Sequence, residues 1–422
     1  MIESADVQRL FVALQSVNRK IADQIPSGPE LFTDQNWRNV ILLAKNNSLG
    51  PLLFFRREKN RTWTTVPEDV REDLHREYVA NAVQNAIFSH KLRALLEALA
   101  EAGIEVIPLK GIHLAELVYE NPALRTIGDA DLLVRVEDLA AAQAVMRALG
   151  FAQVRTPSFE ATREVLQHFP PYTKAGNIDV EIHWNIGNPH HGTVLDAPEL
   201  WTRSRRAKIA GVEVKVLSPA DLLLHLCFHM SVHHVFKGHL RALFDISETL
   251  ARHKGDLDWE VFRQGCGNPV IARGSYLALV LARKHAEANV PDEILEGLRP
   301  AGDSRQALKT AEEFLFYGGH STVHFSVARL WGPYPFSEKV RHFWKGLFLA
   351  RSHMETKYSV SRSSPRIYIF YLLRIVEQIN RHGKIAWRLF TREKEMTEDS
   401  GNALKENALR DWMNPGMKSV VF

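Results

Sequence analysis

The sequence predicts an α+β protein, in which a mixed core of strands and helices lies between two mainly helical regions. Short apolar or alternating segments bounded by turn residues indicate the strands. They are residues 104–109, 129–136, 151–154, 172–174, 177–184 and 206–217. After Ser218, which is placed to cap a helix with Pro219 at its first position, the pattern becomes helical.

The remaining helices are predicted from apolar stripes, caps and breakers. The longest covers residues 69–102, where Phe88, Leu92 and Leu99 share one face and Gly103 ends the segment. The others are residues 4–18, 34–44 with Asp34 as cap, 112–120, 137–149 and 161–169. Four regions follow: a helical lead-in (1–68), an α+β core (69–217), a helical domain lining a cleft (218–338) and a basic, aromatic C-terminal region with a loose tail (339–422).

Length and composition exclude several classes of protein. With 422 residues, the chain is long enough for two or three domains, each with its own core. A formal net charge of +4 is too small to indicate nucleic-acid binding through bulk charge. No apolar run approaches the roughly 18 residues that suggest a membrane span. The N-terminus lacks a signal-peptide pattern and Cys227 and Cys266 lack metal-ligand spacing, so we expect a cytoplasmic protein without an integral membrane segment.

Two aspartates, Asp129 and Asp131, enter the predicted strand 129–136. Side chains alternate along a strand, so both carboxylates point to the same face. Neighbouring carboxylates repel each other unless a cation lies between them, and oxygen ligands on a rigid strand suit Mg²⁺ better than zinc. Such pairs hold two metal ions roughly 3.5–4 Å apart in polymerase-type phosphoryl transfer. The pattern therefore predicts a site for two Mg²⁺ ions.

A lysine–glycine pair lies between the predicted strand 104–109 and the predicted helix 112–120. Gly111 lets the backbone approach an anion, and a helix N-terminus offers free amides to phosphate. Lys110 is either a phosphate ligand or a surface lysine at a strand end, and its setting favours phosphate. Arg125 either clamps the same phosphates through two hydrogen bonds or braces the loop through backbone carbonyls.

A third acid is expected on the predicted strand 177–184, where Asp179, Glu181 and His183 share one face. A ligand at the centre of a strand is held more rigidly than one at its start, which favours Glu181 over Asp179. His183 can meet the metal, orient the acid, activate an acceptor hydroxyl or fill a purely structural role.

Three segments together resemble a known family. Leu-Lys-Gly at 109–111, Arg-x-x-x-Asp-x-Asp-Leu-Leu-Val at 125–134 and Val-Glu-Ile-His-Trp at 180–184 are similar to the uncharacterised bacterial nucleotidyltransferase family, a branch of the polymerase-beta-like superfamily. The resemblance runs from about residue 37 to 259. It implies a nucleotidyltransferase-type mixed sheet, and it puts the third acid two residues before the His-Trp pair, at Glu181.

The chain departs from the superfamily pattern at the phosphate loop. The resemblance implies a strand that ends in a small Gly-Ser turn, but here Lys110 precedes Gly111 and Ile112 follows it. The serine hydroxyl that would touch the triphosphate is therefore missing.

Three histidines repeat every four residues, at His225, His229 and His233, so they share one helix face. Histidines at this spacing can bind zinc, but the glutamate of the metalloprotease motif is absent. A wall of a polar pocket near the active site is therefore the favoured interpretation. Asp245 is placed to pair with one of these imidazoles.

Basic and aromatic residues mix between residues 339 and 394. Such a helix can lie on an anionic membrane or on RNA. It can also pack its apolar side on the protein and leave its arginines in water, and the shortness of the apolar run favours this arrangement.

These motifs predict an enzyme that moves a nucleotidyl group from a nucleoside triphosphate, such as ATP, to an acceptor hydroxyl or phosphate and releases pyrophosphate. The three acids hold the metals, and Lys110, Gly111 and Arg125 bind the pyrophosphate. Two alternatives stay open: a non-catalytic nucleotide sensor of the same fold, and a membrane-peripheral or RNA-interaction protein that acts through the basic C-terminal segment. The sequence names neither the base, nor the oligomeric state, nor the acceptor, which can be a sugar phosphate, a protein or tRNA.

Overall fold

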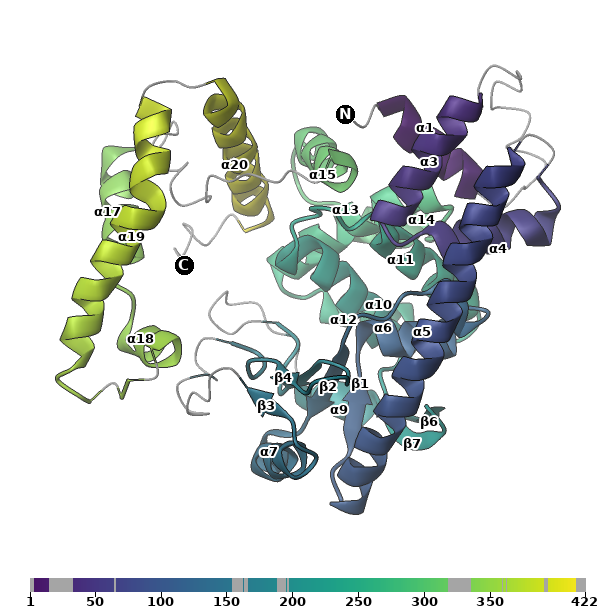
Figure 1. Cartoon of the computed structure of the whole chain (residues 1–422). Coiled ribbons are helices and arrows are strands. Elements are labelled where there is room, and N and C mark those ends of the chain that lie inside the picture. Colours follow the sequence, from purple (N-terminus) through teal and green to yellow (C-terminus); the bar gives the residue numbers. More distant parts are fainter. Residues whose placement is uncertain are drawn as a thin grey trace.

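The structure is a computed structural model of the whole chain (Figure 1). The residues that it describes are 4–14, 33–63, 66–153, 162, 166–187, 195, 197–317, 335–358, 360–361, 363–390 and 394–414. Of the predicted helix 161–169, residues 161 and 163–165 lie outside these residues. Residues 166–169 are not helical, because His168 pairs with His183 in a β-bridge instead.

A five-stranded mixed sheet forms the core, in the order β1-β2-β5-β4-β3. The strands are β1 (Val106–Pro108), β2 (Ala130–Val134), β3 (Ala152–Gln153), β4 (Tyr172–Thr173) and β5 (Val180–His183). Only the β2–β5 pair is parallel, whereas β1–β2, β5–β4 and β4–β3 are antiparallel. A separate hairpin, β6 (Arg205–Ile209) with β7 (Val212–Val216), turns at Gly211 as predicted. The predicted α+β class is confirmed.

Helices precede, interrupt and follow this sheet. In the first half they are α1 (Ser4–Leu14), α3 (Asp34–Asn46), α4 (Gly50–Asn60), α5 (Glu68–Glu101), α6 (Lys110–His113), α7 (Leu139–Ala148) and α9 (Ala197–Arg203). In the second half they are α10 (Pro219–Phe228), α11 (Leu240–Arg252), α12 (Trp259–Gly265), α13 (Pro269–Ala286), α14 (Asp292–Leu298), α15 (Arg305–Tyr317), α17 (Phe336–Leu347), α18 (Arg351–Tyr358), α19 (Ile367–Phe390) and α20 (Lys394–Met413). Two helices continue as π-helical turns: α6 through Leu114–Val118 and α10 through His229–His233.

Local chemistry sets several of these limits. Gly103 adopts φ +74° and ends α5, and the Ser218 hydroxyl accepts a hydrogen bond from the Asp221 amide at the start of α10. The predicted cap of α3 was one residue off, because the Thr33 hydroxyl accepts the hydrogen bond of the Asn36 amide while Asp34 is already helical.

Two hydrophobic clusters divide the two faces of the sheet. Leu132 and Val134 pack with α5 and α7, whereas Leu133 faces the cluster that contains α10, α11 and α13. Alternation therefore turns Asp131, which shares a face with Leu133, toward the helical second half. The lead-in helices α1, α3 and α4 contribute to the same cluster as α10–α15, so that cluster extends across the predicted boundary at residue 68 (Figure 1).

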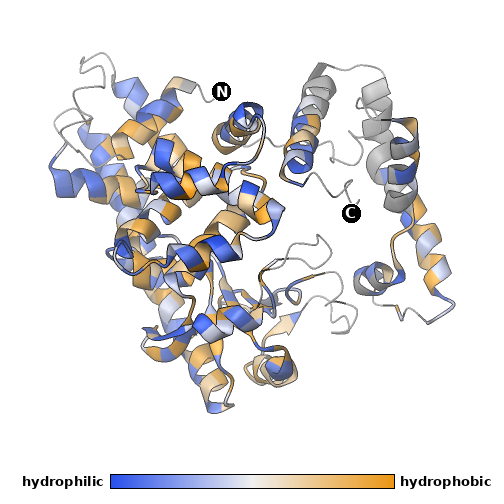
Figure 2. Cartoon of the chain, turned by 180° about the vertical axis from the view of Figure 1, so that it is seen from behind, coloured by the Kyte–Doolittle hydropathy of each residue, from blue (hydrophilic) through white to orange (hydrophobic). Residues whose placement is uncertain are grey.

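The C-terminal region corrects two predictions. The predicted loose tail forms a helix, α20. Its Leu409 and Met413 belong to the cluster of α10–α15, so the chain up to Met413 is packed on the protein. The apolar side of α19 is packed only in part: Ile367 is buried with Met354 of α18, whereas Leu372 is 65% exposed, and Arg374 is buried instead of lying in water. Figure 2 shows hydrophobic residues along the described part of α19. Within the described residues, no helix combines the length and the apolar character needed to cross a membrane.

Candidate active site

Parallel pairing brings two acids face to face. In the register of β2 and β5, Asp131 lies opposite Glu181. Between them lies His183, whose Nε2 is 2.9 Å from Oδ1 of Asp131 and 3.2 Å from Oε2 of Glu181. The donor atoms of all three residues lie within 4.8 Å of one another. We call these three residues the acid cluster.

Cationic groups stabilise the carboxylates of the acid cluster. Burial by itself would lower the pKa of His183, but its hydrogen bonds to Asp131 and Glu181 outweigh burial and raise that pKa. Burial by itself would raise the pKa of Asp131, but His183 and Lys110 reverse the effect and lower it. An imidazolium and a lysine ammonium therefore stabilise the buried Asp131 carboxylate.

Asp129 lies next to this cluster but outside the strand. Strand β2 begins at Ala130, one residue later than predicted, and Asp129 is exposed. The pKa of its carboxyl group is nevertheless raised, first by partial loss of hydration and then by the negative charge of Asp131. It is therefore an acid that a nearby cation would help to ionise.

Lys110 reaches back into the acid cluster, with Nζ 2.9 Å from Oδ2 of Asp131. Its backbone has φ +46°, an uncommon conformation for a residue with a side chain, at the point where β1 gives way to α6. A Cβ atom on the next residue, Gly111, would lie 3.1 Å from Nη1 of Arg125. The Lys110–Gly111 turn is thus packed directly between Asp131 and Arg125.

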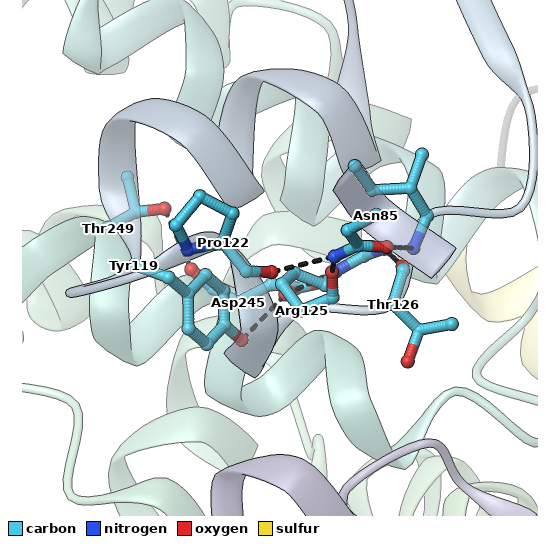
Figure 3. A network of polar contacts seen from close by, with 8 residues as sticks. Asn85, Tyr119, Pro122, Arg125, Thr126, Asp245 and Thr249 are labelled. Atoms are coloured by element: carbon cyan, nitrogen blue, oxygen red, sulfur yellow. Dashed lines mark hydrogen bonds and ion pairs between the residues drawn. The ribbon is translucent and has the colours of Figure 1, made fainter. Parts of the chain in front are cut away.

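Arg125 is engaged by protein partners (Figure 3). Its Nε and Nη2 donate to the two carboxylate oxygens of Asp245, each at 3.0 Å, and its Nη1 donates to the carbonyl of Thr126. Tyr119 donates a further hydrogen bond to Asp245, at 2.8 Å. The sequence left two roles open for Arg125, clamping phosphates or bracing the loop. These contacts favour the bracing role.

The prediction that Asp245 pairs with a histidine is wrong. Asp245 is buried beside Arg125, and the positive charge of that guanidinium outweighs burial and lowers the pKa of the Asp245 carboxyl group. A guanidinium matches both carboxylate oxygens at once, which a single imidazole nitrogen cannot do.

The histidine stripe is broken by the π-helical turn at residues 229–233. His225 and His233 remain ring neighbours of His229, at 6.2 and 5.8 Å between centroids. Two other histidines come closer: His234 lies 4.4 Å from His229, and His239 lies 3.7 Å from His234. Sequence reasoning missed both, because it assumed a regular helix through residue 233.

These histidines lie near the Lys110 turn. Burial is the main reason that their pKa values are lowered, to about 3 for His234 and about 4 for His239, and the charge of Lys110 adds to the effect at both. The same two causes lower the pKa values of His225 and His229. The imidazoles are therefore neutral bases at physiological pH.

His168 is a further neighbour of the acid cluster that the sequence did not indicate. Its ring centroid lies 4.8 Å from that of His183, and its Nδ1 lies 3.7 Å from Oε2 of Glu181. It falls in the segment 161–169 that the sequence predicted as helix, whereas its backbone forms a β-bridge with His183.

A mixed sheet with acids opposite each other on adjacent parallel strands is the arrangement that the family resemblance implied. The family model described as "Uncharacterised nucleotidyltransferase" matches residues 33–287, more than half of the chain. The chain belongs to this uncharacterised nucleotidyltransferase family.

Among solved structures, the chain is similar to an antigenic nucleotidyltransferase-like protein from Paracoccidioides brasiliensis, with 18% identity and a TM-score of 0.29 over 47% of this chain and 93% of that one. No curated protein matches the chain.

Proposed function

We propose that the protein is a metal-dependent nucleotidyltransferase that uses a nucleoside triphosphate. An acceptor hydroxyl or phosphate oxygen attacks the α-phosphorus, the bond from that phosphorus to the bridging oxygen breaks, and pyrophosphate leaves. The observation that supports this proposal best is the opposition of Asp131 and Glu181 on adjacent parallel strands, with Lys110 on the same carboxylate.

The residues present fit divalent metal ions such as Mg²⁺. Two carboxylates and an imidazole offer metal-ligating atoms within 4.8 Å of one another. Asp129 adds a third carboxylate, which is close enough to Asp131 for the charge of Asp131 to raise its pKa. Oxygen-rich sites of this kind suit Mg²⁺. Asp129, Asp131 and Glu181 would hold the ions, two in number. Bound there, they would neutralise charge at the phosphorus centre and lower the pKa of the acceptor.

The chain's own residues bind and orient. Lys110 contacts Asp131, and the ammonium at the end of its flexible side chain would turn to a phosphate oxygen of the bound triphosphate. His183 holds a proton at Nε2 between the two acids, so it fixes both carboxylates. A cation that enters the acid cluster competes with this proton, and metal binding should therefore weaken as the pH falls.

The test is release of pyrophosphate from each of the labelled nucleoside triphosphates, with and without Mg²⁺, in the presence of a cell extract that supplies acceptors. Mg²⁺-dependent release by the wild-type protein, and none by Asp131→Asn, is the expected result. Triphosphate binding without pyrophosphate release would favour the nucleotide sensor instead, because Lys110 and His183 already neutralise the acids without a metal.

A further inference from the structure

We propose that His229, His234 and His239 form a separate metal site for a transition ion of the zinc type. Each of the three imidazoles offers a nitrogen, and these three atoms lie within 4.8 Å of one another. The site is distinct from the acid cluster in both its residues and its donor chemistry. It does not depend on the proposed transfer reaction.

The nitrogen–nitrogen distance between His229 and His234 matches that of two ligands of a tetrahedral ion. Nε2 of His234 lies 3.2 Å from Nε2 of His229. Zinc binds imidazole nitrogen at about 2.0–2.1 Å in tetrahedral geometry, which separates two such nitrogens by about 3.3–3.4 Å. A shared hydrogen bond would also bring two imidazoles together, but it needs only two rings. The third ring, that of His239, lies 3.7 Å from the ring of His234 between centroids and is tilted by 42° to it. A hydrogen bond between His229 and His234 does not account for this third imidazole.

The backbone departs from regular helix to bring the rings together. In the π-helical turn the amide of His234 donates to the carbonyl of His229, so residues five apart lie over one another. A regular helix would instead align His229 with His233.

Two consecutive non-glycine residues then take left-handed conformations, Val235 at φ +48° and Phe236 at φ +63°. These are unfavourable for a β-branched and an aromatic residue. Both side chains are fully buried, which anchors the turn that returns the chain to His239. Strain of this kind is common where a site must be held in one geometry.

The donor set favours zinc over magnesium. Imidazole nitrogen suits zinc, copper and nickel, whereas Mg²⁺ takes oxygen ligands. The three side chains are half-buried, so a fourth ligand such as water or an acceptor oxygen can reach the ion. Three protein ligands with one position left for a small molecule are typical of catalytic zinc sites.

Zinc binding to the full-length chain tests the proposal, with the ion titrated by calorimetry and the visible spectrum of Co²⁺ recording tetrahedral coordination. We expect one Zn²⁺ per chain, and a loss of affinity of at least about 100-fold in His234→Ala and in His239→Ala. His234→Cys, which restores a zinc ligand, should recover part of the affinity. Asp131→Asn should still bind Zn²⁺, because it changes only the acid cluster.

The matched controls are His225→Ala and His233→Ala, which remove the histidines of the regular helical stripe. They should keep the zinc affinity and the tetrahedral Co²⁺ spectrum. Loss of zinc in these variants but not in His234→Ala would overturn the proposal, and so would a wild-type protein that binds no zinc. Circular dichroism of each metal-free variant identifies any that has failed to fold. If His239→Ala is among them, His239→Gln replaces it in the comparison.

Discussion

Arg125 and Asp245 form a buried ion pair with two parallel contacts of 3.0 Å, which ties the loop before β2 to α11 (Figure 3). The pair joins the segment that carries the acids to the helical second half. Removing one partner would leave the other charge buried and uncompensated, which typically costs several kcal/mol.

We therefore predict that Asp245→Asn destabilises the protein by about 3–5 kcal/mol. Chemical denaturation of wild type and variant measures the difference. Asp256→Asn is the control: it removes the exposed partner of Arg205, and such exposed pairs contribute little to stability because solvent screens them. Equal, small effects in the two variants would show that the Arg125–Asp245 pair does not brace the loop.

Asp131 in β2 and Asp129 just before it should respond differently to neutralisation. Asp131 has two cationic partners, so Asp131→Asn should destabilise the metal-free protein by about 1–3 kcal/mol as well as abolish pyrophosphate release. Asp129 is exposed and is repelled by Asp131, so Asp129→Asn should leave thermal stability unchanged or slightly higher while activity is lost. Melting curves with EDTA separate the two, and full activity in either variant would contradict the assignment of metal ligands.

Lys110 should matter for nucleotide binding more than for the chemical step. The proposed phosphate contact of Lys110 would be made in the ground state, so Lys110→Ala should raise KM for the triphosphate more than it lowers kcat. Gly111→Val should do worse, since a Cβ there already meets Arg125 at 3.1 Å. The control is Lys174→Ala. The Lys174 ammonium donates to the carbonyl of Leu149, away from the acids. Unchanged triphosphate affinity in both loop variants would exclude this turn from the site.

His113 should make the protein sensitive to acid. Burial, with a smaller contribution from the charge of His253, lowers its pKa to about 3. In the unfolded chain the ring binds a proton below about pH 6.5, whereas in the folded chain it stays neutral. Stability should therefore fall as the pH drops from about 6.5 to 3, by on the order of 3–5 kcal/mol over the full window.

The variant His113→Leu should reduce this acid dependence in a series of denaturation curves, and the remainder comes from other buried histidines such as His234. His90→Leu, at an exposed position of α5, is the control and should keep the wild-type slope. The same slope in His113→Leu and wild type would mean that other groups account for the loss of stability.

The local sequence pattern was enough to predict those features that depend on residues close together in the sequence. The period of two along a strand predicted that Asp131 turns to one face, and turn and cap chemistry predicted both the β6–β7 hairpin and the start of α10. Contacts between residues far apart in the sequence could not be predicted from local pattern. Arg125 and Asp245 are 120 positions apart, and nothing near either residue in the sequence identifies the other.

The grouping of His234 with His229 depends on a change of helix type that spacing alone does not reveal. A regular helix would have aligned His233 with His229, and the sequence contains no proline or glycine between them to indicate the π-helical turn. The exposed apolar side of α19 was missed for a related reason, because amphipathic spacing gives a face but not its partner.

The limits of the strand favour Glu181 over Asp179 as the third acid. Glu181 lies inside β5, opposite Asp131, and Val180 and Ile182 anchor it from the other face. Asp179 is exposed and precedes the strand, although its carbonyl accepts the hydrogen bond of the Ala130 amide. A ligand inside the strand is held more rigidly, so we predict that Glu181 is the third acid.

Glu181→Gln should therefore still bind a triphosphate with Mg²⁺, because Asp129 and Asp131 remain, but it should turn over at least about 100-fold more slowly. Asp179→Asn keeps its backbone hydrogen bond and should stay active. Calorimetry measures binding and pyrophosphate release measures turnover in the same preparations. The reverse behaviour, an active Glu181→Gln and an inactive Asp179→Asn, would move the third ligand to Asp179 and require the acids to meet at the entry of β5 instead of its centre.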